Sequence, residues 1–181
     1  MDAIEVLTQD HRRVEALFDD FDRAAGPDQR KEIMNQIVRE LSMHAAIEEE
    51  VLYPSVREAL PEGERLVQES LQEHGDVKQM LADLDDMPGT QQGFEEKAGN
   101  LFQDVRHHAE EEEGEIFPKL REQVGQEILD DMGRQLESAK GHAPTRPHPL
   151  APDQPPALKL AGPIAAIVDR IRDRIGGRPT G

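Results

Sequence analysis

The chain has 181 residues, and its 38 acidic against 21 basic side chains give a formal net charge of −17. Such a surface repels phosphates and anionic lipids, so we expect no nucleic-acid role. The sequence contains no cysteine, which excludes disulfides, thiolate metal ligation and cysteine nucleophiles. It has no apolar run of the roughly 18 residues that a membrane span needs, and its start lacks signal-peptide features. A cytoplasmic location is therefore expected.

Apolar residues recur at helical spacing through the first 121 residues, and no segment alternates with the period of a strand. We predict helices at residues 2–24, 28–60, 62–86 and 91–121. Pro54 should kink the second helix or end its regular part, and Pro118 sits near the end of the fourth. Residues 1–121 are therefore predicted to form an all-α, antiparallel up-down-up-down four-helix bundle.

The remaining chain divides into three predicted segments. Residues 122–141 contain an additional helix, and 142–163 hold seven of the 13 prolines, a composition typical of an extended linker. Residues 164–181 carry isoleucine and valine on one helical face, which predicts an amphipathic C-terminal helix or tail. We expect this helix to dock on the bundle or on a second copy of the chain, as in a homodimer. Contact with a membrane surface or partner protein, or a largely disordered tail, is the alternative.

Four histidines and two glutamates form a duplicated pattern. His11 and His44 lie 33 residues apart, and His74 and His108 lie 34 apart. Four residues after each second histidine comes a glutamate, Glu48 or Glu112, and a proline follows six residues later. All six residues fall within the apolar stripes of their helices, so they should point into the core of the bundle.

A buried carboxylate is costly unless it is paired or bound to metal. Two carboxylates among four imidazoles, with no lysine or arginine on the same stripes, therefore indicate a two-metal site. These ligands suit iron, manganese or zinc, and a bridged pair in a helical bundle favours iron. The ordinary interpretation of any one of these histidines alone is a hydrogen-bonded core residue. His107, His142 and His148 are not expected to be ligands. The other acids in residues 48–50 and 110–113 are interpreted as solvated.

These motifs resemble the bacterial type of the hemerythrin-like (HHE cation-binding) domain family over residues 1–121. The motifs that carry the resemblance are Asp10-His11, His44-Ala-Ala-Ile-Glu48, Glu73-His74 and His108-Ala-Glu-Glu-Glu112. The resemblance implies a non-haem di-iron centre bridged by an oxo or hydroxo group. It implies four terminal ligands and two bridging ones: His11, His44, His74 and His108, and Glu48 and Glu112.

Two residues bear on what such a centre does. Oxygen-carrying members of the family have a second histidine one turn after the third-helix histidine, where this chain has Lys78. That departure disfavours reversible oxygen storage. A regular helix places Tyr53 about 140° from Glu48, which favours a packing role. A distortion at Pro54 would instead swing Tyr53 toward an open iron position, and similar proteins have a tyrosine near the iron, so Tyr53 is a candidate catalytic residue.

The leading hypothesis is a di-iron protein that reacts with a small oxidant, by catalase-like decomposition of hydrogen peroxide in oxidative or nitrosative stress defence. The alternative is non-enzymatic binding or sensing of O2, NO or iron. A third hypothesis is a metal-free acidic scaffold. Manganese and zinc are the alternatives to iron.

Overall fold

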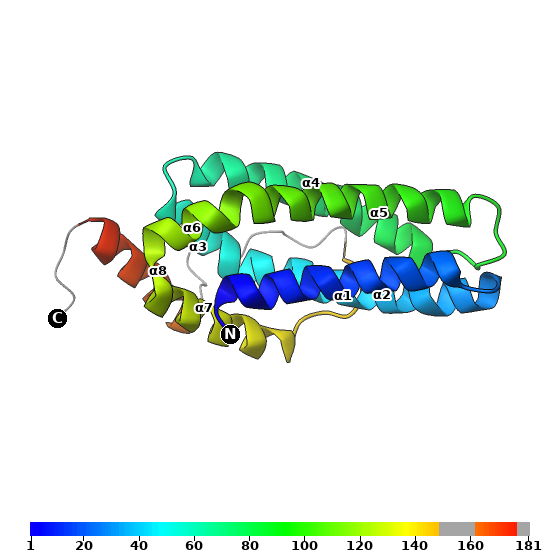
Figure 1. Ribbon diagram of the computed structural model, residues 1–181, viewed down its shortest axis with the longest axis horizontal. Helices are drawn as coiled ribbons and strands as arrows, with labels where there is room; N and C mark the ends of the chain where they lie inside the picture. Colours follow the sequence, from blue (N-terminus) through cyan, green and yellow to red (C-terminus); the bar gives the residue numbers. More distant parts are fainter. Residues whose placement is uncertain (149–161, 177–181) are drawn as a thin grey trace.

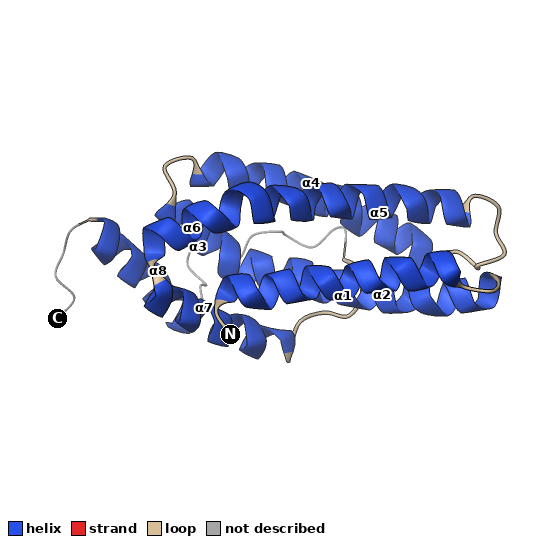
Figure 2. Cartoon of the chain, in the orientation of Figure 1, coloured by secondary structure: helices blue, strands red, loops and turns tan. Residues whose placement is uncertain are grey.

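The computed structural model describes residues 1–148 and 162–176. Four long helices lie side by side (Figure 1): α1 (Ala3–Arg23), α2 (Pro27–Ile47), α4 (Gly63–Asp86) and α5 (Phe94–Glu111). No β-strand occurs within the described residues (Figure 2), which confirms the all-α four-helix bundle. None of the described helices is long and apolar enough to cross a membrane.

Local sequence signals start the first two helices. The Asp2 carboxylate accepts a hydrogen bond from the backbone N–H of Glu5 at 2.9 Å, and the Glu5 carboxylate accepts one from the backbone N–H of Asp2 at 2.9 Å. This reciprocal capping satisfies two N–H groups that α1 cannot pair internally. Pro27 is the first residue of α2, where its fixed φ suits a helix and its missing N–H is not needed.

Pro54, which was predicted to disturb its helix, follows a π-helical turn, and Pro118 follows another. The first turn, Glu48–Leu52, leads into α3 (Tyr53–Ala59), and the second, Glu112–Ile116, leads into α6 (Phe117–Val124). The backbone N–H groups of Tyr53 and Phe117 bond to the carbonyls five residues earlier, those of Glu48 and Glu112. A proline ring crowds the carbonyl four residues before it, so the regular hydrogen-bond ladder cannot run through these positions. Each wide turn begins at one of the two repeated glutamates.

The core of the bundle consists of two apolar clusters with a polar layer between them. One cluster, which includes Leu7 and Leu71, extends to the end of the bundle where α3 and α6 lie. The other, which includes Val14 and Val77, fills the opposite end. The repeated histidines and glutamates lie on the same helices between the two clusters. Apolar packing on both sides therefore holds the polar layer in place.

Two further helices cover the α3–α6 end (Figure 1). Helix α7 (Gln126–Lys140) packs on α1, and a Cβ on Gly133 would come within 2.4 Å of the Met1 carbonyl oxygen, so only glycine permits this approach. Helix α8 (Gly162–Ile175) packs on α3, α6 and α7. It buries four aliphatic side chains: Ile164, Ile167, Val168 and Ile171.

The C-terminal helix therefore docks on the bundle, as expected, and begins at Gly162, two residues earlier than predicted. Arg172 fixes it to α3, with Nε and Nη2 donating to the Glu58 carboxylate at 3.0 and 2.9 Å. Most of the predicted linker lies outside the described residues. The division of the chain at residues 121, 141 and 163 stays a prediction.

Candidate metal centre

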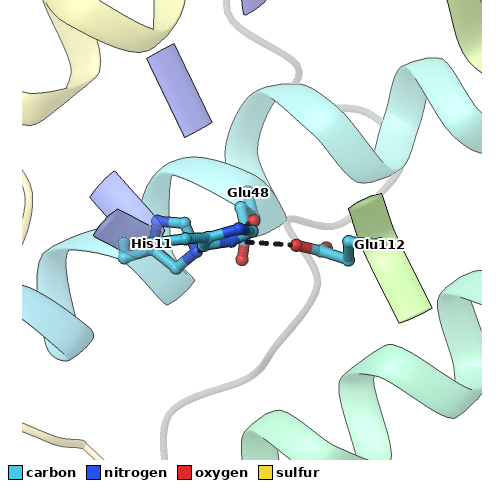
Figure 3. Close-up of side chains that lie close together, drawn as sticks. His11, Glu48 and Glu112 are labelled. Carbon is cyan, nitrogen blue, oxygen red and sulfur yellow. Dashed lines mark hydrogen bonds and ion pairs between the residues drawn. The ribbon is translucent and has the colours of Figure 1, made fainter. Parts of the chain in front are cut away.

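The six residues of the duplicated pattern come together in the polar layer, each less than a tenth exposed. Nε2 of His11 lies 3.1 Å from Nε2 of His44, and Nε2 of His74 lies 3.2 Å from Nε2 of His108. Figure 3 shows His11, Glu48 and Glu112 directed toward one another, with the His11–Glu112 ion pair dashed. The core placement predicted from the stripes is confirmed.

Each buried carboxylate lies between a histidine of the first sequence repeat and a histidine of the second. Oε1 of Glu48 is 3.1 Å from Nε2 of His44, and its Oε2 is 3.3 Å from Nε2 of His74. Glu112 has the same arrangement, with Oε2 3.4 Å from Nε2 of His11 and Oε1 3.5 Å from Nε2 of His108. One oxygen of each glutamate thus faces a histidine of the first repeat and the other faces a histidine of the second. This is the geometry that a bridging carboxylate needs.

The arrangement of the donor atoms suits metal coordination better than hydrogen bonding among the side chains themselves. Although the nitrogen–oxygen distances are those of ion pairs, the four oxygens of Glu48 and Glu112 have no partner with hydrogen-bond geometry among the described residues. Two ligand atoms about 2.1 Å from one ion, at right angles or slightly more, are about 3.0–3.4 Å apart, close to the Nε2–Nε2 spacings. Within the polar layer, the atoms within reach of one another form two sets that share Glu48: His11, His44, Glu48 and Glu112, and Glu48, His74 and His108.

The other ring nitrogen of each histidine faces a second carboxylate, and we call Asp10, Glu49, Glu73 and Glu113 the outer carboxylates. Nδ1 of His11 lies 2.8 Å from Glu113, Nδ1 of His74 lies 2.9 Å from Glu49, and Nδ1 of His108 lies 2.6 Å from Glu73. Nδ1 of His44 lies 3.7 Å from Asp10, longer than a hydrogen bond.

The outer carboxylates fix the tautomer of the imidazoles they bond. When Nδ1 carries the proton donated to a carboxylate, the Nε2 lone pair points into the layer. Two such lone pairs, on His74 and His108, meet at 3.2 Å. They repel each other unless a proton or a metal ion lies between them. The hydrogen bonds around the site therefore favour a cation inside it.

Cationic side chains in turn contact three of the outer carboxylates. Lys140 of α7 lies 2.9 Å from Asp10, and Arg12 lies 2.7 Å from Glu113. Lys78 contacts both oxygens of Glu49 at 2.8 and 3.0 Å. Lys78 thus acts on His74 through Glu49.

The metal-free site holds protons tightly. Burial alone lowers the pKa of His44, but the charge of Glu48 and the carboxylate of Asp10 outweigh it and raise that pKa to about 10. Burial is likewise outweighed at His74, where Glu48 and Glu49 raise the pKa to about 9. Burial raises the pKa of Glu48, yet the imidazole of His44 brings it well below its ordinary value. Protonated imidazoles thus balance the buried carboxylates in the absence of a metal.

Tyr53 is buried, and its hydroxyl lies 2.9 Å from Nε2 of His74, inside the polar layer. The π turn brings it there, because the residue five after Glu48 lies back over that glutamate. In the second repeat Phe117 stacks on His11 with ring centroids 6.0 Å apart. At this position the two halves of the layer therefore differ by one hydroxyl. Burial, followed by the charges of Glu48 and Glu112, raises the pKa of Tyr53 well above its ordinary value.

The interpretation of the neighbouring acids as solvated is wrong for Glu49 and Glu113, which bond His74 and His11. Their signal in the sequence is adjacency, since each directly follows one of the repeated glutamates. The side chain of His107 is 65% exposed.

Comparisons with known proteins agree with this geometry. Residues 2–120 match the family described as the hemerythrin HHE cation-binding domain. An uncharacterized hemerythrin-like protein of Schizosaccharomyces pombe is 32% identical over 170 residues, covering 93% of this chain and 84% of that protein. A DNA nickase of a Nostoc species is 29% identical over 140 residues, covering 77% of this chain and 39% of the nickase.

A solved structure has the same fold. It is a hemerythrin HHE cation-binding domain-containing protein from Mycobacterium kansasii, with a TM-score of 0.65 and 23% identity. The alignment covers 94% of this chain and 99% of that one.

Proposed function

Because the chain belongs to the hemerythrin HHE cation-binding domain family, we propose that its polar layer holds two iron ions and decomposes hydrogen peroxide in a catalase-like reaction. The supporting observation is the placement of Glu48 and Glu112, each with one oxygen toward a histidine of either repeat. His11 and His44 would hold one ion and His74 and His108 the other, with the two glutamates between them.

The donor set supports iron as the metal. The layer offers imidazole nitrogens and carboxylate oxygens, and the chain has no cysteine to supply a thiolate. Such sets bind iron, manganese or zinc, and paired carboxylates inside a four-helix bundle are typical of di-iron and di-manganese proteins. When bound, iron supplies the redox chemistry that the side chains of this layer lack.

The protein's own contribution is to position these groups in apolar surroundings. Apolar clusters cover the layer from both ends, so charges within it are poorly screened. The outer carboxylates Glu49, Glu73 and Glu113 hold the Nδ1 protons of their histidines and thereby orient the Nε2 atoms inward.

Tyr53 is the candidate residue for contact with the reacting molecule. Its hydroxyl lies at Nε2 of His74, and the high pKa of the buried phenol keeps its proton in place in the metal-free layer. A hydroxyl at this point can donate a hydrogen bond to a small oxidant, or bind a ferric ion as phenolate. Phe117 offers neither capability in the other half of the layer.

Metal content and absorption test the first part of the proposal. Protein purified after growth in iron-supplemented medium should contain about two irons per chain and absorb in the near ultraviolet, as bridged di-iron sites do. Glu112→Ala should lose most of the iron. If the wild-type protein retains no iron, manganese or zinc, only the hypothesis of a metal-free scaffold remains.

Oxygen release tests the second part. Iron-loaded protein should release O2 from hydrogen peroxide, and His44→Ala should abolish the release. If peroxide is inert but nitric oxide or O2 shifts the spectrum reversibly, the non-enzymatic binding function replaces the enzyme. The nickase activity named for the Nostoc relative is not proposed, because this chain corresponds to 39% of that protein and carries a net charge of −17.

A further inference from the structure

A cavity of about 310 Å³ lies against the four histidines of the polar layer. His11, His44, His74 and His108 all border it, whereas neither Glu48 nor Glu112 is among the described residues that line it. Its walls are otherwise mainly apolar: Val14, Phe18, Leu41, Val77 and Val105. The space therefore reaches the ligand nitrogens from the side that the bridging glutamates leave open.

The cavity extends to the surface between α1 and α5. Its outer lining is charged and includes Arg12, Glu15, Arg106 and Glu113. Helices α1 and α5 approach each other less closely than α1 and α2 or α4 and α5. Charged side chains bridge the separation: Arg106 of α5 lies 2.7 Å from Glu15 of α1, and Arg12 of α1 lies 2.7 Å from Glu113 in the π turn that follows α5.

Arg106 lies over this opening in a defined position. Its Nε and Nη2 donate to both oxygens of Glu15, and its guanidinium carbon lies 5.4 Å from the centre of the Phe18 ring. Both partners of the ion pair are more than 40% exposed. Exposed ion pairs contribute little to stability and open readily. The pair can therefore separate and close again without disturbing the packed helices.

We propose that this cavity is the route by which small uncharged molecules reach the metal positions, and that the Glu15–Arg106 ion pair is its movable cover. This inference rests on the proposed function and adds the route by which its substrate would enter. Apolar walls admit neutral molecules with few atoms and disfavour ions, which lose hydration on entry. Hydrogen peroxide, O2 and nitric oxide all belong to this class.

If the cavity were only a packing defect, substitutions that fill it would have a different effect. Lining atoms of an empty cavity lack van der Waals partners, so filling the space should raise stability and change nothing else. A route has a second property, because filling it slows the arrival of a ligand. The rate of ligand association therefore separates the two cases.

The test uses iron-loaded full-length protein and nitric oxide as the probe, followed by stopped-flow absorbance. Val105→Phe fills the cavity one turn before His108 and should slow association at least tenfold with unchanged iron content. Leu17→Phe is the matched control, since Leu17 is partly buried against the same apolar cluster but does not line the cavity. Its rate should equal that of the wild type.

A second pair of variants tests the cover. Arg106→Ala should speed association several-fold, whereas Arg13→Ala, which removes an exposed α1–α2 ion pair with Glu40, should not. If Val105→Phe loses its iron, the rate of nitric oxide association with Arg106→Ala decides whether the cavity is the route. If the wild-type protein binds iron and nitric oxide but neither Val105→Phe nor Arg106→Ala alters the association rate, the route is overturned while the proposed function stands. Wild-type protein that takes up no metal would overturn the proposed function, and the route with it.

Discussion

The hydroxyl of Tyr53 lies 2.9 Å from Nε2 of His74, the imidazole nitrogen that also faces Glu48 and His108. The corresponding residue of the second repeat, Phe117, stacks on His11 without a hydroxyl. Duplicated sequence thus produces two half-sites of unequal chemistry.

Tyr53→Phe should separate the structural from the chemical role of the hydroxyl. The second repeat already has phenylalanine at this position, so the ring should be accommodated. Loss of one buried hydrogen bond should cost about 1 kcal/mol, lowering the Tm by about 2–4 °C. Iron content should stay the same while the visible absorption and the oxygen-release rate change. An unchanged spectrum and rate would make Tyr53 a packing residue.

Removing an outer carboxylate should weaken metal binding although no ligand is lost. Glu73→Gln removes the charge that Nδ1 of His108 faces at 2.6 Å. Loss of such a partner typically lowers metal affinity about 10- to 100-fold. Chelator competition measures the affinity. Glu69→Gln, one turn earlier on α4 and paired with Arg65 at the surface, is the control and should keep wild-type affinity.

The stability of the metal-free protein should fall as pH rises above neutrality. The pKa values of His44 and His74 are about 10 and about 9 in the fold, against an ordinary 6.5. Their stabilisation is fully present below pH 6.5 and is lost as pH rises through 9 and 10. Thermal melts in chelator between pH 6.5 and 10 should show a falling Tm.

The metal-loaded protein should lack this dependence, because Nε2 atoms bound to metal carry no proton. Metal uptake at pH 7 should also release protons from His44 and His74, which a pH indicator in weak buffer would detect. A metal-free Tm that is constant or rises across the same range would contradict the charge balance inferred for the layer.

Docking of α8 should contribute substantially to stability. Ile171 is fully buried against the bundle, and Ile171→Ala should cost about 2–5 kcal/mol, a fall in Tm on the order of 10 °C. Ile175, one turn later on the same helix, is 48% exposed, and its change to alanine should have an effect within about 0.5 kcal/mol. Equal effects of the two changes in thermal melts would mean that α8 is not docked in solution.

The apolar stripes predicted the architecture and the inward direction of the six repeated residues. Leu7 and Val14 bracket His11, and Leu71 and Val77 bracket His74, so burial of the flanking residues carries each histidine into the core. Helical periodicity is a local property, and it can be read from neighbouring residues in the chain.

The sequence by itself therefore determined which residues face the interior and that two buried carboxylates need a cation. Tertiary structure alone decided that Glu49 hydrogen-bonds His74 and that Glu113 hydrogen-bonds His11. These residues lie on different segments, and residue spacing in the sequence does not show which segments become neighbours. Tertiary structure also decided the direction of Tyr53. Proline predicted a disturbance, but only the π turn at Glu48, with its wider hydrogen-bonded ring, turned the phenol toward His74.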